Sequence, residues 1–172
     1  MPPEIDLHAL ASLLPGTWRI GATNLPVWLS GQRLFPTVEY TVKSPKPLRL
    51  SDLVAYTTAQ GRQKRDFGRC RLRGGEFVGR AGRLGPIVRR WSIAGANADA
   101  SIAVIRFSRT RSMPAGLDVI AREGEENADL RTAVASASER FGLTAEDFAS
   151  LTWFDPPVHT ASWRAPRTSR LR

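Results

Sequence analysis

Short runs of alternating apolar and polar residues follow one another through most of the chain, and they restrict its fold more than any other feature. The clearest run is TVEYTVK, residues 37–43, in which Val38, Tyr40 and Val42 share one face and polar residues share the other. Strands this short and this regularly spaced predict an all-β barrel or sandwich. The other predicted strands are 16–24, 50–58, 68–74, 75–83, 86–95, 100–110 and 115–123, and the segment 61–68 between two of them is predicted to be a charged connection.

The last three predicted strands carry apolar residues on both faces, so they require a second layer outside the sheet. The segment 127–142 supplies apolar residues at helical spacing, with Asn127 as a candidate N-cap and Gly142 after its end. We expect this helix to lie against the outside of a barrel. A short helix beginning at Asp6 and another beginning near Thr144 complete the predicted elements.

The stretch LPGTWRI, residues 14–20, places a glycine two residues before a tryptophan at the start of the first strand. In this strand Trp18, Ile20 and Ala22 are predicted to share a face. The long apolar loop 25–36 follows, and its Trp28 and Leu29 would be a liability at the surface unless they covered something.

This order of elements, with Gly16-x-Trp18 on the first strand, resembles the lipocalins. The segment 127–154 is similar to the helix-plus-strand ending of bacterial lipocalins, and the stretches TNLPVWL (23–29) and SMPAGLDVIAR (112–122) resemble lipocalin-like proteins of fungi and actinobacteria. The resemblance covers roughly residues 6–154. It implies an eight-stranded antiparallel up-and-down β-barrel, with a short N-terminal helix and one C-terminal α-helix packed outside. It also implies that Trp18 plugs the closed end beneath an arginine of the last barrel strand. Arg122 in DVIARE fits this role better than Arg109, which leaves too much chain before the helix. Gly16 is expected to let the N-terminal helix pass close beneath.

We therefore predict one lipocalin-like domain over residues 1–154 and a flexible basic tail over 155–172. The net charge is +9, and the window Arg62–Arg111 holds 13 Lys and Arg against 3 Asp and Glu. A basic field of this kind favours anionic ligands, acidic surfaces or nucleic acid. Nearly all the cations are arginine, however, and we slightly favour genome base composition over selection for a partner as the origin of this charge.

Several kinds of chemistry lack the residues they need. Neither histidine lies in a predicted strand, which argues against a haem held inside the barrel. No metal-ligand spacing or phosphate loop is present, so we predict no cofactor and no metal. Cys70 has no evident activating partner and is interpreted as a small apolar residue. With no signal peptide and no transmembrane segment, we expect a cytoplasmic protein.

The remaining candidates are residues that could line a binding cavity. For the apolar ones, ordinary core packing is an equally good interpretation. Arg89 and Arg106 lie on apolar faces, and each points either outward along the surface or inward toward an anionic group. The predicted ligand-binding residues are Trp28, Leu29, Tyr40, Tyr56, Phe77, Trp91, Arg89, Arg106 and Phe107, with Val38, Val42 and Val54 as further lining.

Three functions are compatible with these patterns. The first is binding of one small hydrophobic or amphipathic, preferably anionic, molecule inside the barrel, as in a carrier or storage protein. The second is a cavity enzyme, such as a cyclase or isomerase, which would need no nucleophile. The third, ranked last because no named nucleic-acid motif is present, is contact with nucleic acid or another acidic partner through the basic window 62–111 and the tail. The oligomeric state stays open.

Overall fold

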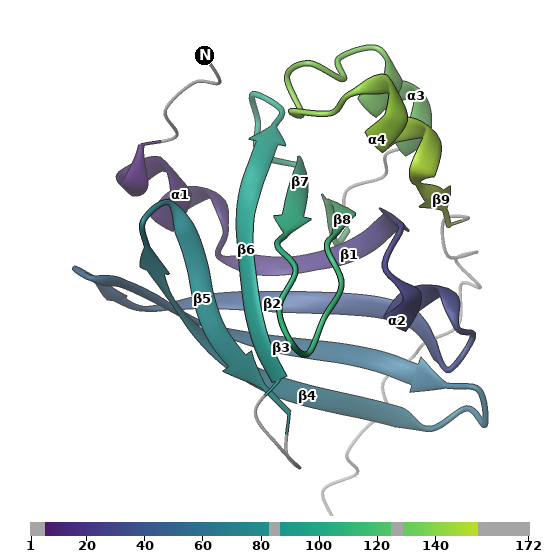
Figure 1. Ribbon diagram of the computed structural model, residues 1–172, viewed down its shortest axis with the longest axis horizontal. Helices are drawn as coiled ribbons and strands as arrows, with labels where there is room; N and C mark the ends of the chain where they lie inside the picture. The colour runs from purple at the N-terminus through teal and green to yellow at the C-terminus, as the bar shows by residue number, and fades with distance from the viewer. Residues whose placement is uncertain (1–5, 83–86, 125–128, 155–172) are drawn as a thin grey trace, which may run out of the picture.

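Eight antiparallel strands close into a barrel in the computed structural model, which describes residues 6–82, 87–124 and 129–154 (Figure 1). Each strand pairs with the next from β2 to β8, β8 pairs with β1, and β1 pairs with β2 to complete the ring. The predicted eight-stranded antiparallel barrel is therefore confirmed. Its strands are β1 (Gly16–Thr23), β2 (Arg33–Pro45), β3 (Leu48–Thr58), β4 (Gln63–Arg73), β5 (Glu76–Ala81), β6 (Ile87–Ala96), β7 (Ile102–Phe107) and β8 (Gly116–Arg122).

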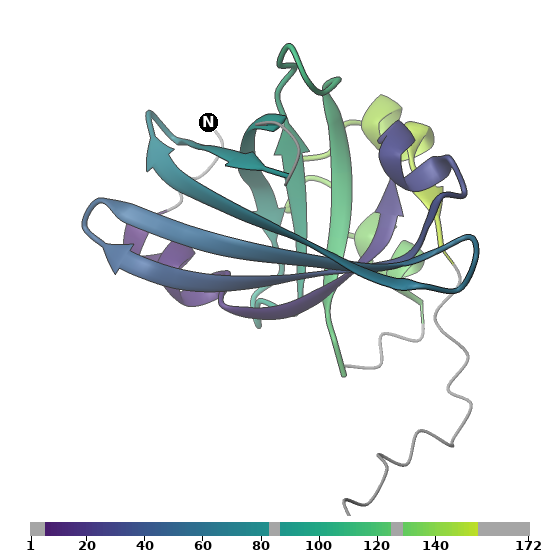
Figure 2. The same cartoon turned by 90° about the horizontal axis from the view of Figure 1, so that it is seen from below.

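The two ends of the barrel differ. At one end lies helix α1 (Leu7–Leu13), which leads into β1. At the other end β1 parts from β2, because their pairing stops at Arg19 and Thr37, and the short helix α2 (Pro26–Leu29) lies there. We call the α2 end the mouth. The strands β2 to β4 cross β6 to β8 at a steep angle, as strongly tilted barrel strands do (Figure 2).

Strand β4 is longer than the sequence predicts. It begins at Gln63, so the segment predicted as a charged connection is wrong. Lys64 pairs with Tyr56 and Asp66 pairs with Val54 in regular antiparallel register. Charged residues are accommodated here because Arg65 lies on the outward face, while the inward positions of Lys64 and Asp66 lie at the rim of the mouth, where Lys64 is exposed and Asp66 is half-buried beside Arg33.

A β-bulge changes the faces of β1. Pairing with β8 shifts between Ile20 and Ala22, which inserts Gly21 as an extra residue. Ile20 packs in the barrel interior, whereas Ala22 packs in the outer apolar cluster. The prediction that Ala22 shares the face of Trp18 is therefore wrong, and the bulge turns Thr23 inward instead, where it bonds Asp118.

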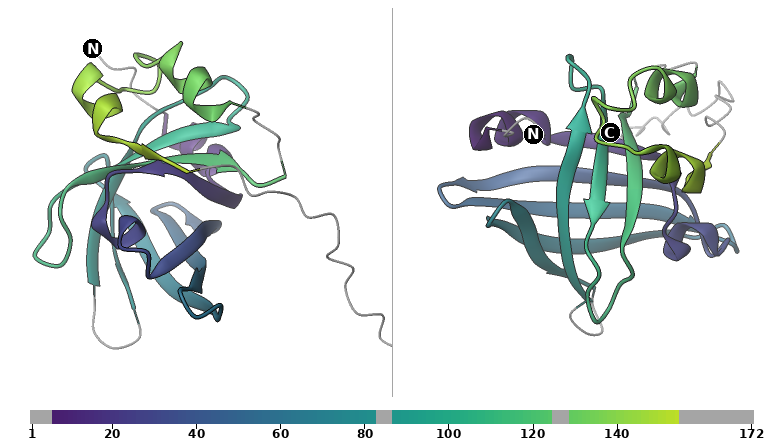
Figure 3. Two further views of the ribbon diagram at one scale, coloured as in Figure 1. Left: turned by 90° about the vertical axis from the view of Figure 1, so that its right-hand side faces the viewer. Right: turned by 45° about the horizontal axis from the view of Figure 1, so that its top comes forward.

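An outer layer covers β1, β7 and β8, as the two-sided apolar pattern predicts. Its helices are α3 (Leu130–Ala135) and α4 (Ala145–Ser150), followed by the short strand β9 (Thr152–Trp153), which pairs with β1 (Figure 3). Leu130, Val134 and Phe141 bury their side chains against the outward residues of β7 and β8.

Helix α3 is shorter than predicted. It ends at Ala135, where the hydroxyl of Ser136 donates to the carbonyl of Thr132 at 2.6 Å. Serine side chains compete in this way for helix carbonyls, and turns then carry the chain to Phe141. The N-cap is Asp129, while the predicted cap Asn127 lies outside the described residues, as does the predicted tail 155–172. Helix α4 begins with the capping box predicted at Thr144.

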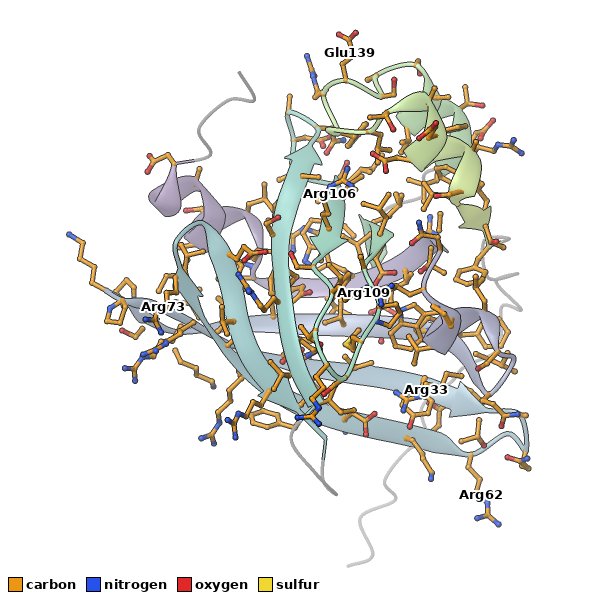
Figure 4. The ribbon with its side chains drawn as sticks, viewed as in Figure 1. Arg33, Arg62, Arg73, Arg106, Arg109 and Glu139 are labelled. Atoms are coloured by element: carbon orange, nitrogen blue, oxygen red, sulfur yellow. The ribbon has the colours of Figure 1, made fainter. Side chains whose placement is uncertain are left out.

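A stacked pair closes the α1 end of the barrel. Trp18 is fully buried, and its indole Nε1 donates to the carbonyl of Leu14 at 2.9 Å. The Arg122 guanidinium lies 3.9 Å from the centroid of the Trp18 rings, and its nitrogens donate to the carbonyls of Leu13, Pro15 and Ala100. Arg109 is exposed on the loop between β7 and β8, at the mouth (Figure 4).

Gly16 makes room for this arginine. Its φ of +113° lies in a region that side chains rarely adopt, and a Cβ built there would be 2.5 Å from Nη1 of Arg122. The close neighbour that demands a glycine is thus the guanidinium, whereas the expected reason was the passage of the N-terminal helix.

Gly16→Ala is expected to lower the free energy of unfolding by about 2–4 kcal/mol, because backbone strain adds to displacement of Arg122 from Trp18. Urea denaturation measures this change. The control Gly31→Ala has φ +74° and nothing within 4 Å, so it should cost only about 1–2 kcal/mol. In an Arg122→Ala background Gly16→Ala should cost less, and equal costs in both backgrounds would contradict the proposed contact.

Candidate functional site

Most of the predicted lining residues point into the barrel and form one aromatic cluster. Trp91 lies at its centre, with the Phe77 ring stacked at 4.3 Å and the Tyr40 ring tilted at 5.4 Å between centroids. Tyr56 is buried in the same interior, and Phe107 is half-buried against it. Val38, Val42 and Val54 pack there too. The interior near the closed end is therefore apolar and largely filled by its own side chains.

The two residues predicted to cover the mouth, Trp28 and Leu29, lie in different environments. Trp28 packs against the barrel interior, and its Nε1 donates to Oδ2 of Asp118 at 3.3 Å. Leu29 is 42% exposed and faces solvent at the end of α2. The geometry supports Trp28 as a cover over the mouth and gives no such support to Leu29.

Arg89 lies inward and meets an acid that the sequence analysis did not single out. Its Nη2 donates to Oδ2 of Asp52, and the side chains are only 14% and 3% exposed. Gly68 leaves the space for this pair, because a Cβ there would collide with both groups. Oδ1 of Asp52 and Nε of Arg89 are buried and have no hydrogen-bond partner among the described residues. Buried polar atoms are nearly always satisfied, so this pair needs an explanation.

Arg106 lies on the other side of the sheet. Its guanidinium donates to Asp147 of α4 at 2.8 Å and to the carbonyl of Gly142 at 3.0 Å, outside the barrel (Figure 4). It shares a face with Ile102 and Val104, as predicted, but both of these residues belong to the outer cluster. Alternation in a strand with two apolar faces does not say which face is inside, so Arg106 is no longer a candidate for contact with a ligand in the barrel.

A second acid that the sequence analysis left unassigned is buried near the mouth. Asp118 is 4% exposed, and its Oδ1 accepts a hydrogen bond from Thr23 at 2.7 Å. Burial raises the pKa of this carboxyl to about 7, although the bonds from Thr23 and Trp28 act in the opposite direction. Both oxygens of Asp118 already accept hydrogen bonds, from Thr23 and from Trp28 of α2. The geometry therefore favours a role in holding α2 in place rather than a role as a free acid or base.

The rim of the mouth carries a further ion pair. The Arg33 guanidinium lies 4.5 Å from the centroid of the Tyr56 ring, and its Nη1 is 3.0 Å from Oδ2 of Asp66. Each charged side chain is about one-third exposed, at 32% and 34%. The polar groups of the interior are thus arranged from the middle of the barrel to its mouth.

Both acids were visible in the sequence as inward positions of predicted strands. Asp52 shares the inward face of its strand with Leu50 and Val54, and Asp118 shares the inward face of its strand with Ile120. The sequence analysis considered arginines on apolar strand faces but not carboxylates on such faces. Considering carboxylates as well identifies Asp52 as a candidate partner for Arg89.

Cys70 and Tyr40 stay protonated inside the barrel. Burial raises the pKa of the Cys70 thiol to about 12, so the sulfur stays protonated and unreactive at neutral pH. Burial, with a contribution from Asp52, also raises the pKa of Tyr40. Within the described ranges, no group of three or more His, Cys, Asp or Glu side chains is placed to hold a metal ion.

The sequence matches no protein-family model and no curated protein. Solved structures, however, share its fold. A tryptamine complex of the amine-binding protein of Rhodnius prolixus superposes with a TM-score of 0.60 and 13% identity over 83% of this chain and 78% of that one. Lobster apocrustacyanin A1 gives 0.57 and 11% identity over 89% and 87%.

The fold that this chain shares with both structures is a closed, eight-stranded antiparallel β-barrel of lipocalin-like form. At such low identity the likeness concerns the fold alone. No helix in the described part of the chain has the length and apolar character needed to cross a membrane.

The raised pKa of Asp118 predicts a pH-dependent stability. The unfolded carboxyl titrates near pH 4 and the folded one near 7, so the native state holds an extra proton in between and loses stability as the pH rises through this window. Asp118→Asn removes this dependence. Relative to the wild type, the variant should gain about 2–4 kcal/mol between pH 4 and pH 8 in urea denaturation. A difference that stays constant over this range would show that Asp118 titrates normally.

Proposed function

We propose that this protein binds one small amphipathic molecule in the mouth half of its barrel. The observation that carries the proposal is the buried pair Asp52–Arg89, in which one acceptor and one donor lie unsatisfied within an otherwise aromatic and aliphatic interior. An eight-stranded barrel is just wide enough to be filled by side chains or to hold one small ligand. Apolar burial supplies the affinity of such a site, and a few polar groups orient the ligand.

The Asp52–Arg89 pair also restricts the charge of the ligand's head group. The sequence predicts an anionic ligand because Arg89 could face a carboxylate. Asp52, however, neutralises that arginine, and its free oxygen would repel a second carboxylate. We therefore propose a neutral head group with a donor for Oδ1 of Asp52 and an acceptor for Nε of Arg89, such as an amide.

Native mass spectrometry of gently purified protein tests binding directly. The expected result is a discrete added mass that extraction into organic solvent removes. This measurement makes no assumption about the head group.

The head group is tested by titrating tryptophan fluorescence with decanamide, decanoate and decylamine, which share one tail. Decanamide is expected to give a saturable change and to bind about tenfold tighter than either charged ligand, because only it satisfies both polar atoms. In the double variant Asp52→Asn/Arg89→Gln this preference should disappear. Asp66→Asn, at the rim, is the matched control and should keep it.

Two outcomes would contradict the proposal. If none of the three compounds gives a saturable response, and native mass spectrometry finds only the bare chain, the barrel is a filled scaffold. If decanoate binds tightest, the ligand is anionic and the argument from Asp52 is wrong.

A further inference from the structure

The outward face of β4 carries a row of cations on the side of the sheet away from the aromatic interior. Outward and inward positions alternate along this strand, so that buried Gly68 and Cys70 separate exposed residues. Every outward position from residue 65 to residue 73 is arginine except one, which is phenylalanine. These outward residues are Arg65, Phe67, Arg69, Arg71 and Arg73.

Neighbouring strands add like charges directly opposite two arginines of this row, whereas Glu76 of β5 lies opposite Arg73. Arg49 of β3 pairs with Arg71, and Arg80 of β5 pairs with Arg69. Like charges facing each other across strands destabilise a sheet. The ion pairs of the described residues involve Arg33, Arg89, Arg90 and Arg106, so none of the facing arginines is neutralised by a described carboxylate. This face therefore keeps a concentrated positive charge.

The same face is hollowed. A groove of about 1110 Å³ runs over β3, β4 and β5. Arg73 marks one end of β4 in Figure 4, where nitrogen-tipped side chains project from the sheet beside it. Cations line the groove from four strands: Lys43, Arg49, Arg69, Arg71 and Arg80.

An aromatic ring lies in this basic groove. Phe67 is 52% exposed, and the Arg69 guanidinium is 5.5 Å from its ring centroid. A phenylalanine exposed to this degree gains little from packing at the surface. A positively charged groove with an accessible aromatic ring is the arrangement that binds single-stranded nucleic acid, because cations follow the phosphates and a base stacks on the ring.

We propose that this groove binds single-stranded nucleic acid, without sequence preference. Outward residues repeat every ~6.8 Å along a strand, so the arginines of β4 form a linear track for a phosphate chain. An anionic membrane suits the face less well, because the aromatic ring lies within a groove between charged side chains. Neither Asp52 nor Arg89 lines the groove, so the two proposals stand or fall separately.

Fluorescence anisotropy with a labelled oligothymidylate of about 16 nucleotides tests this proposal on the full chain. Binding should weaken with salt, with a slope of log K against log salt of about −3 to −4 if the five lining cations each meet one phosphate. The variant Arg69→Gln/Arg71→Gln/Arg80→Gln should lower the affinity at least tenfold at low salt, and it should reduce the slope by about 2.

The control Arg109→Gln/Arg111→Gln/Arg131→Gln removes the same charge from exposed positions that do not line the groove, and it should change the affinity less than about threefold. Phe67→Leu should weaken binding about fivefold or more through lost stacking. Phe35→Leu, at a ring 71% exposed elsewhere, should have no effect.

Three results would overturn the proposal. The first is an absence of salt-dependent binding by the wild type. The second is an equal loss in the groove and control triple variants, which would show that net charge alone attracts the oligonucleotide. The third is tighter binding to vesicles of phosphatidylserine and phosphatidylcholine that depends on Phe67, which would assign the face to a membrane. Circular dichroism of each variant verifies that the barrel is intact.

Discussion

The stack of Arg122 on Trp18 closes one end of the barrel and thereby makes its two ends different. Its guanidinium bonds carbonyls of Leu13, Pro15 and Ala100, which belong to the end of α1, the following turn and the loop between β6 and β7. One side chain thereby joins three segments that the strand ladder alone does not hold together. A cation stacked on an indole in a dry environment gains about 2 kcal/mol or more. Because this end is sealed, polar groups in the interior can reach solvent only at the mouth.

The charges of the molecule fall into compensated and uncompensated sets. Inside the barrel Arg89 meets Asp52, and at the rim Arg33 meets Asp66. Outside β7, Arg106 meets Asp147 of the covering helix. Among the described residues no ion pair joins an outward arginine of β4 to a carboxylate, although Glu76 lies opposite Arg73 in the ladder. This contrast argues that the basic face reflects more than an arginine-rich composition, because composition alone would not leave one face unpaired.

The sequence predicts the barrel well because alternation and turn residues are local signals. It places Tyr40 and Trp91 inward, and the capping box at Thr144 is explicit in the residue spacing. It fails where the outcome depends on contacts between distant segments. The bulge at Gly21 is set by pairing with β8, and the facing of Arg106 is set by α4. The alternation pattern within one β-strand contains neither the position of this bulge nor the side of the sheet on which Arg106 lies.

The candidate site shows the same division between local and distant information. Arg89 was identified by its position on an apolar face, but its partner Asp52, 37 residues away in the sequence, could not be identified from that position. Only the barrel closure brings these strands across from each other, with Gly68 leaving the space between them. The predicted anionic ligand, which rested on Arg89 and on the basic charge of the chain, stays a prediction.

The Asp52–Arg89 pair is difficult to explain as a stabilising element. Burying two charges costs several kcal/mol for each ion, and well-packed apolar residues of similar volume often give equal or greater stability. The cost is larger here, because two polar atoms of the pair have no described partner. The neighbouring Tyr40, Trp91 and Phe77 show that the interior can be filled by large apolar side chains where stability is the only requirement. A charged pair with two unsatisfied polar atoms at this depth is therefore poorly explained by stability alone, and this supports the proposal that the barrel binds a molecule with a neutral head group.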